Sequence, residues 1–128
     1  MIVVDSSALI EIISNAKAAE ACMHTLEAAD EVLISAGTMT ECLIVALGHK
    51  AEQPLRELFD HFGLTVAPLT EARAQAAADS YRRYGKGWHP AGLNFGDCFA
   101  YALAKEVDCP LLFVGDDFAK TDIASALA

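Results

Sequence analysis

The sequence lacks paired cysteines. Its four cysteines, Cys22, Cys42, Cys98 and Cys109, stand far apart in apolar surroundings and form no Cys-x-x-Cys pair. A structural zinc site requires such closely spaced ligands, so this class of site is excluded. We expect all four to be reduced thiols, most of them buried.

Basic residues are also scarce. Nine lysines and arginines stand against eighteen acidic residues, which gives a formal net charge of -9. Proteins that bind nucleic acid by neutralising many phosphates are usually basic, so the charge argues against a long nucleic-acid footprint. A small contact bridged by cations stays compatible with this composition.

No apolar run is long enough to cross a bilayer. Hydrophobic residues make up 54% of the chain, yet the most apolar stretch, Cys42–Leu47, is far shorter than the roughly 20 residues a membrane span needs. The N-terminus has neither a basic segment nor a small-residue cleavage site. We therefore predict a cytoplasmic protein without membrane association, folded as one domain over residues 1–128.

Short apolar runs alternate with helical patterns along the chain. The runs with strand character are 2–4, 32–34, 64–66 and 111–114, and the helical patterns cover 18–29, 38–47, 54–62, 71–84 and 97–107. Apolar strands separated by helices are typical of a parallel sheet covered on both faces. The predicted fold class is α/β, a three-layer α/β/α arrangement with a central, mostly parallel sheet.

Each of the notable acids has an ordinary structural explanation. Asp5 follows the first strand and could cap the next helix. Glu41 forms a possible capping box with Thr38, and Asp97 stands early in a helix, where the dipole favours an acid. The pair Asp116–Asp117 follows Gly115 in a possible turn.

Taken together, these acids are expected to meet at one edge of the sheet. In a parallel sheet with helical crossovers, strand ends and helix starts meet at one edge, where open α/β sheets bind ligands. Asp5 and Asp116 would end strands, whereas Glu41 and Asp97 would begin helices. Clustered carboxylates repel one another, and hard divalent cations with oxygen ligands compensate that charge. The sequence therefore predicts a Mg²⁺ or Mn²⁺ site at this edge.

Four segments carry a resemblance to a known family. Together they extend from Ile2 to about Asp122; the segments around Asp97 and Asp116 match in the flanking residues as well as in the acid, and the stretch around Glu41 falls at the expected interval. The chain resembles the PIN-domain nucleases, and most closely the VapC-type toxins of bacterial toxin–antitoxin pairs. The segments are Ile2–Leu9, Thr40–Glu41, Leu93–Ala104 and Leu112–Asp122.

The resemblance implies a metal-dependent endoribonuclease that cleaves RNA by metal-activated water. It implies that Asp5 and Asp97 are direct metal ligands and that Glu41 and Asp116 complete an acidic quartet. Products would carry a 5′-phosphate and a 3′-hydroxyl.

Further acids and a hydroxyl belong to the implied site. The family usually has another acid near the fourth, and Asp117 and Asp122 both qualify; many relatives have Asn in place of Asp116, so the sequence leaves open which of these acids matters most. Ser7 matches a family hydroxyl that approaches the metal.

The break after the helical pattern at 71–84 is a candidate RNA contact. Residues 81–89 bring Arg82, Arg83 and Lys86 together with aromatic side chains, and His89 is a weaker candidate. Such a segment can neutralise phosphates and stack unpaired bases. The alternative is a solvated helix end whose cations complement the dipole.

The resemblance also implies partners, namely an antitoxin that blocks the acids and a second copy in a homodimer. The apolar residues Leu9, Ile10, Ile12 and Ile13 fit either a partner surface or the core. Two other classes stay open: a phosphoryl-transfer domain of receiver or dehalogenase type, and a catalytically silent binding module. The Asp-x-Asp signature of the dehalogenases is absent after the first strand, where the chain reads Asp5-Ser6-Ser7.

Overall fold

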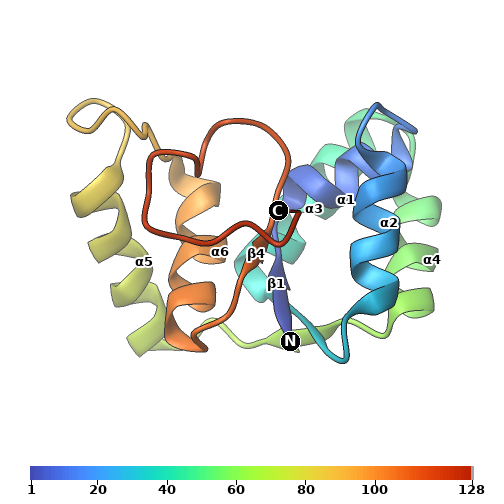
Figure 1. Ribbon diagram of the computed structural model, residues 1–128, viewed down its shortest axis with the longest axis horizontal. Helices are drawn as coiled ribbons and strands as arrows, with labels where there is room; N and C mark the ends of the chain where they lie inside the picture. Colours follow the sequence, from blue (N-terminus) through green and yellow to red (C-terminus); the bar gives the residue numbers. More distant parts are fainter. Residues whose placement is uncertain (128) are drawn as a thin grey trace.

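A parallel β-sheet lies between two layers of helices (Figure 1). The computed structural model describes residues 1–127. All three pairings of neighbouring strands are parallel, which confirms the predicted three-layer α/β/α class. The elements in chain order are β1 (Ile2–Val4), α1 (Ser6–Ile13), α2 (Ala19–Ala28), β2 (Val32–Ser35), α3 (Ala36–Gly48), α4 (Glu52–Phe62), β3 (Thr65–Ala67), α5 (Glu71–Tyr84), α6 (Phe95–Glu106) and β4 (Leu111–Leu112).

Local hydrogen bonds explain where the boundaries differ from the predicted ones. Helix α3 starts before Thr38 because the Ser35 side chain accepts a hydrogen bond from the Gly37 N–H, at 3.2 Å, and so caps the helix. Strand β4 ends early because the Val114 N–H donates to the Ser7 hydroxyl, at 3.0 Å, instead of joining the sheet ladder.

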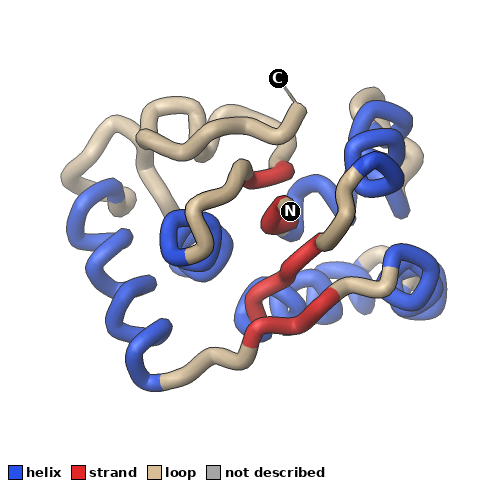
Figure 2. Tube along the Cα trace, turned by 60° about the horizontal axis from the view of Figure 1, so that its bottom comes forward, coloured by secondary structure: helices blue, strands red, loops and turns tan. Residues whose placement is uncertain are grey.

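The strands lie in the order β3-β2-β1-β4 (Figure 2). Consecutive residues of a strand point to opposite faces of the sheet, so the apolar side chains of the strands pack alternately against the two helix layers. Ile2 and Val4 pack with α1, α2, α3 and α4 on one face, while Val3 packs with α5 and α6 on the other. The segment after β4 covers the second face too, through the buried ring of Phe118.

The order of the strands reverses between β1 and β4. The chain proceeds from β1 to β2 and β3 toward one side of the sheet, then returns through α5 and α6 to β4 on the other side of β1. Open α/β sheets bind ligands where the order reverses, beyond the carboxyl ends of the strands. Asp5 follows β1 and Asp116 follows β4, so this point of the fold receives acids from both strands.

Two predictions about apolar residues can be compared with the structure. All four cysteines are free, and only Cys109 is less than fully buried, as predicted. Leu9 is buried, and Ile12 and Ile13 pack against the core, so the core explanation holds for the first helix. Within residues 1–127, no helix has the length and apolar character that spanning a membrane requires.

Candidate active site

Asp5 caps α1 with one carboxylate oxygen and leaves the other without a hydrogen-bond partner among the described residues. Its Oδ2 accepts hydrogen bonds from the backbone N–H and the hydroxyl of Ser7, at 3.1 and 2.7 Å. Its Oδ1 is buried and has no hydrogen-bond partner within residues 1–127. The capping interpretation is therefore correct but incomplete, because an unpartnered buried oxygen requires a ligand or a compensating charge.

Asp97 has a similar double role at the start of α6. The Asn94 side chain accepts a hydrogen bond from the Asp97 N–H at 2.9 Å, and Asp97 Oδ2 accepts one from the Asn94 N–H at 3.0 Å. This capping box fixes the Asp97 side chain in the first turn, where the helix dipole favours its charge. Asp97 is buried, which is unusual for a cap that serves only local structure.

Glu41 reaches the site from the second turn of α3. The predicted capping box with Thr38 is wrong, because Ser35 caps this helix. Glu41 Oε1 accepts a hydrogen bond from the Ser6 hydroxyl at 2.8 Å. Its Oε2 lies against Gly96 so closely that a Cβ at Gly96 would stand 2.1 Å away, and α3 and α6 therefore bring Glu41 beside Asp97.

The turn after β4 supplies the remaining acids. Gly115 has φ 96°, and the Asp116 carbonyl accepts a hydrogen bond from the Ala119 N–H at 3.1 Å, so the predicted turn is present. Both Asp116 and Asp117 are exposed, and the charge of Asp117 contributes to the raised pKa of Asp97 after burial and the charge of Asp5. This contribution favours Asp117 as the acid of the turn that acts on the cluster.

Asp122 makes contacts with a different set of side chains from those around Asp5. Its carboxylate accepts a hydrogen bond from the Tyr101 hydroxyl at 2.5 Å and pairs with Lys105 at 3.2 Å. The Tyr101 hydrogen bond, and then the nearby cations, lower the pKa of Asp122. Asp122 therefore belongs to an ion-pair cluster and not to the group around Asp5.

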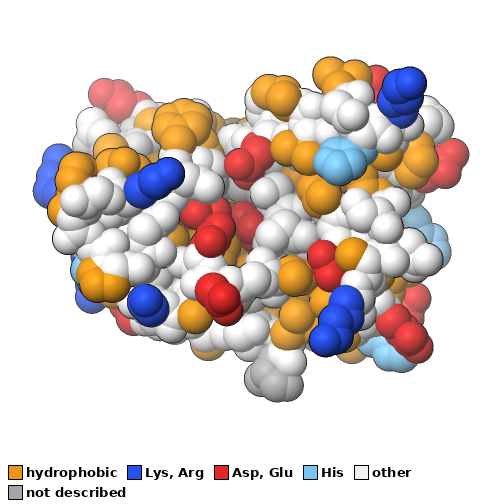
Figure 3. All heavy atoms as spheres, turned by 90° about the horizontal axis from the view of Figure 1, so that it is seen from above, with side chains coloured by type: hydrophobic (Ala, Val, Ile, Leu, Met, Phe, Trp, Pro, Cys, Tyr) orange, Lys and Arg blue, Asp and Glu red, His pale blue; other side chains and the backbone are white. Residues whose placement is uncertain are grey.

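Burial and mutual repulsion dominate the electrostatics of the site. Burial raises the pKa of Asp5 from 3.8 to about 6, and the charge of Glu41 adds to this rise. Burial also raises the pKa of Asp97 from 3.8 to about 7, with further increases from Asp5, Asp117 and Glu41. Acidic side chains gather near the middle of the face above the strand ends (Figure 3).

These residues suit a divalent cation in charge and in donor chemistry. All the donors are carboxylate oxygens, the unpartnered Asp5 Oδ1 is one of them, and Mg²⁺ and Mn²⁺ prefer such ligands. Within residues 1–127, no three His, Cys, Asp or Glu side chains are already arranged to hold a metal. Binding would therefore draw the carboxylates together, and waters would complete the shell.

The three predicted RNA-binding residues differ in whether they already form ion pairs. Arg82 pairs with Asp79, while Arg83 lies 3.8 Å from Asp122. Lys86 is exposed and has no ion-pair partner in the part of the chain that the structure describes. Of the three cations, Lys86 is therefore the one whose charge is not already paired among the described residues.

Sequence reasoning missed two positioning residues, Ser6 and Asn94. Asn94 begins an Asn-x-x-Asp pattern before an apolar run, which is the signal of a capping box. Ser6 carries no comparable local signal, because its partner Glu41 is 35 residues away in sequence.

An apolar groove of about 720 Å³ lies beside the acids, between α5 and α6. Phe95, which is 77% exposed, stands on its rim two residues before Asp97. Exposed aromatic residues around a hollow are typical of protein contact surfaces. The groove is lined by Leu69, Ala74, Ala77, Ala78, Tyr81, Lys86, Asn94, Phe95, Cys98 and Phe99.

Comparison with known proteins agrees with this geometry. The PIN domain family model matches residues 2–124, and the chain therefore belongs to the PIN-domain family. Its curated relatives include ribonuclease VapC28 of Mycobacterium tuberculosis, which is 40% identical over 129 residues and is matched over 98% of this chain and 97% of the relative. Ribonuclease VapC30 of the same organism is 40% identical over 126 residues, covering 96% of both chains.

Solved structures share the fold at low sequence identity. VapC20 of Mycobacterium tuberculosis, described as a sarcin–ricin loop cleaving toxin, superposes with a TM-score of 0.77 at 15% identity over 97% of both chains. A toxin–antitoxin complex from Klebsiella pneumoniae gives a TM-score of 0.72 at 20% identity over 95% of this chain and 93% of that one. These likenesses show that the chain shares the fold of these proteins.

Proposed function

We propose that this chain is the ribonuclease toxin of a toxin–antitoxin pair and that it hydrolyses RNA phosphodiester bonds with a divalent cation. The observation that carries the proposal is the buried carboxylate of Asp5, whose Oδ1 has no partner and which lies in the field of Glu41 and Asp97. Family membership supports the reaction class and replaces the phosphoryl-transfer alternative.

Asp5 and Asp97 would hold the cation. They come from different elements, since Asp5 follows β1 and Asp97 lies in the first turn of α6. When bound, Mg²⁺ or Mn²⁺ supplies activation of a water molecule and neutralisation of phosphate charge. The hydrogen bonds from Ser7 and Asn94 fix the two carboxylates in advance, which reduces the reorganisation that binding requires.

Glu41 and Asp117 act at the rim of the same site. Ser6 holds Glu41 Oε1, which leaves Oε2 to orient the attacking water. Asp117 adds negative charge beside Asp97 and so raises the affinity for a cation. Lys86, exposed in the loop before α6, would contact a phosphate of the RNA strand.

An antitoxin would cover the acids. The chain carries a net charge of -9, and the acidic face shown in Figure 3 calls for a partner segment with basic side chains. A basic side chain inserted among Asp5, Glu41 and Asp97 would take the place of the cation and block cleavage.

A second copy of the chain would occupy the apolar groove between α5 and α6. The exposed side chain of Phe95 and the apolar groove lie on the same face of the chain. In a dimer with a two-fold axis, Phe95 of each copy would insert into the groove of the other copy. Ile44 and Leu47 of α3, which are 64% and 59% exposed, add further apolar surface in the neighbouring layer.

Cleavage of a 5′-labelled single-stranded RNA, with Mg²⁺ or with EDTA, tests the proposal. We expect cleavage only with the metal, and we expect Asp97→Asn to lower its rate by roughly a hundredfold or more. Arg73→Gln is the control, because it removes contacts away from the acids, namely the ion pair with Glu106 and the hydrogen bond to the Pro68 carbonyl. Cleavage that persists in EDTA, or an Asp97→Asn variant with unchanged activity, would refute the assignment, and no cleavage in any condition would favour a silent binding module.

A further inference from the structure

Most basic side chains of this acidic protein are already paired with acids. The ion pairs within residues 1–127 are Arg56–Glu52, Arg73–Glu106, Arg82–Asp79, Arg83–Asp122 and Lys105–Asp122. The chain has nine lysines and arginines, so four of them have no ion-pair partner among these residues. The four are Lys17, Lys50, Lys86 and Lys120, and all are exposed. Their charge is therefore available to an anion outside the chain.

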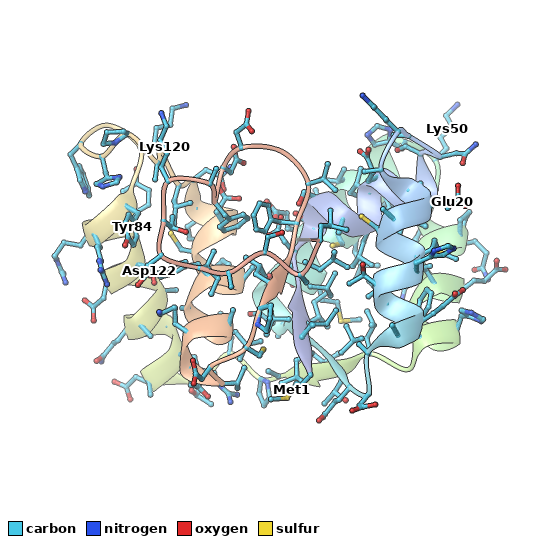
Figure 4. All side chains as sticks on the ribbon, viewed as in Figure 1. Met1, Glu20, Lys50, Tyr84, Lys120 and Asp122 are labelled. Carbon is cyan, nitrogen blue, oxygen red and sulfur yellow. The ribbon has the colours of Figure 1, made fainter. Side chains whose placement is uncertain are left out.

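These four lysines lie at one end of the molecule. Lys17 belongs to the loop between α1 and α2, and Lys50 to the loop between α3 and α4. Lys86 follows α5, and Lys120 lies in the segment after β4. All four segments reach the upper end of the molecule in Figures 1 and 4, where β1 finishes and Asp5 follows. The unpaired cations therefore share the edge that carries the acids.

The lysines form two pairs on opposite sides of the acids. Figure 4 shows Lys120 on the side of α5 and α6, and Lys50 on the side of α1 and α2. Lys86 belongs with Lys120, because its loop joins α5 to α6, and Lys17 belongs with Lys50, because its loop joins α1 to α2. Seen from above in Figure 3, acidic side chains lie near the middle of this face and basic side chains lie to either side of them.

The backbone fixes the first pair of lysines. The Glu11 carbonyl accepts the Ala16 N–H at 3.0 Å, and its carboxylate accepts the Ala18 N–H at 2.8 Å, so Glu11 holds the backbone on both sides of Lys17. Lys50 has φ 55°, in the left-handed region that favours glycine. A lysine at this position is therefore not explained by the end of α3 alone.

The backbone also fixes the second pair. The Lys86 N–H donates to the Leu93 carbonyl at 2.9 Å, and the Lys86 carbonyl accepts the Tyr81 hydroxyl at 3.1 Å. Lys120 comes two residues after Phe118, whose ring is buried. All four ammonium groups thus extend from backbone that is already held in place, which lowers the entropic cost of binding a polyanion.

We propose that an RNA strand crosses the acidic edge with phosphates bound on both sides, by Lys17 and Lys50 on one side and by Lys86 and Lys120 on the other. The inference rests on the proposed function, which places the reaction at the acids between the two pairs. Lysine binds phosphate as a point charge and tolerates any base sequence. The two pairs neutralise phosphates before and after the cleaved bond, so that a chain with a net charge of -9 can hold RNA at this one edge.

A local explanation competes for three of the lysines. Lys17, Lys50 and Lys86 come shortly after the ends of α1, α3 and α5, where cations complement the helix dipole. That explanation predicts a loss of stability when the lysines are removed and no change in RNA binding. It does not extend to Lys120, which follows no helix.

Titrations of a fluorescent single-stranded RNA at several salt concentrations, followed by anisotropy, test the proposal. Asp97→Asn is the reference and the background of every variant, so that the RNA is not cleaved. Lys17→Ala with Lys50→Ala, and separately Lys86→Ala with Lys120→Ala, should each weaken binding about tenfold at low salt. Each pair should also make the slope of log K against log salt shallower by about 1.4, because one phosphate contact on a single strand contributes about 0.7.

A matched control separates phosphate contacts from overall charge. Arg56→Gln with Arg73→Gln removes the same number of cations, but both are already paired with acids. This control should leave the slope unchanged. Urea unfolding in EDTA should give the same stability for the lysine variants as for the reference, because exposed lysines without partners contribute little to the fold.

The outcomes separate this inference from the proposed function. If the reference binds RNA and either lysine pair leaves the slope unchanged, the two-sided path is wrong and the proposed function stands. An equal change in the control pair also overturns the path, because the effect would then come from overall charge. A reference that does not bind RNA overturns the path as well, and cleavage by the wild type then decides the proposed function on its own.

Discussion

Replacing Asp5 with asparagine is expected to stabilise the metal-free protein at neutral pH and to abolish RNA cleavage. Asp5 is 2% exposed, and its Oδ1 lacks a partner within residues 1–127. An asparagine oxygen can still accept the hydrogen bonds from Ser7, so the helix cap survives. What the substitution removes is a buried negative charge next to other carboxylates.

The magnitude follows from the pKa of Asp5. Burial raises that pKa from 3.8 to about 6, which corresponds to roughly 3 kcal/mol at about 1.4 kcal/mol per unit. Below the lower value the carboxyl is protonated in both states, and ionisation costs the fold nothing. Between the two values the unfolded chain releases its proton first, so stability falls as pH rises, and above about 6 the full cost is present.

Urea unfolding, followed by circular dichroism in EDTA, measures this difference. At about pH 7.5 the Asp5→Asn variant should be more stable than the wild type by roughly 1 to 3 kcal/mol, and near pH 4 the two should converge. Added Mg²⁺ should reverse the order by stabilising only the wild type. Glu57→Gln, an exposed acid of α4, is the control. An Asp5→Asn variant that is less stable than the wild type in EDTA at neutral pH would refute the reasoning.

Three further predictions concern the rim of the site and the apolar groove. Ser6→Ala should lower kcat about tenfold with little change in KM, because Glu41 loses its fixed orientation; an unchanged kcat in steady-state assays would contradict this. Lys86→Ala should weaken RNA binding and reduce its salt dependence more than Arg82→Ala does, because Arg82 is already paired; binding titrations at several salt concentrations measure both. Phe95→Asp should convert a dimer to a monomer in sedimentation velocity, and a monomeric wild type would remove the basis of the predicted homodimer.

Much of the fold was accessible from sequence, because parallel strands leave a strong local signal. Runs such as Ile2–Val4 are short, apolar and β-branched, and the helices between them carry their own patterns. The same topology brought Asp5 and Asp97 to one edge, because one follows a strand and the other starts a helix. Their burial and neighbours agree with that placement.

The details that sequence reasoning could not supply depend on long-range packing. Glu41 was expected at this edge, with a capping box as its structural alternative; the box is absent because Ser35 caps α3, and the close approach of Glu41 to Gly96 depends on the packing of α3 against α6, which local residues do not determine. The choice between Asp116 and Asp117 depends on the direction of a turn anchored by Phe118. Likewise, Arg83 was expected to face RNA, and its proximity to Asp122 follows only from the path of the last segment.

The close approach of Glu41 to Gly96 suggests a substitution, Gly96→Ala, that would inactivate the proposed site without removing any acid. Alanine at this position would suit a helix by about 1 kcal/mol better than glycine, and α6 has no strained backbone there. Its methyl group would occupy the space of the Glu41 carboxylate, which stands at the end of a flexible side chain and can rotate away. A single methyl should therefore abolish the proposed cleavage while every acid remains in the chain, so that cells could produce the folded protein without the proposed antitoxin.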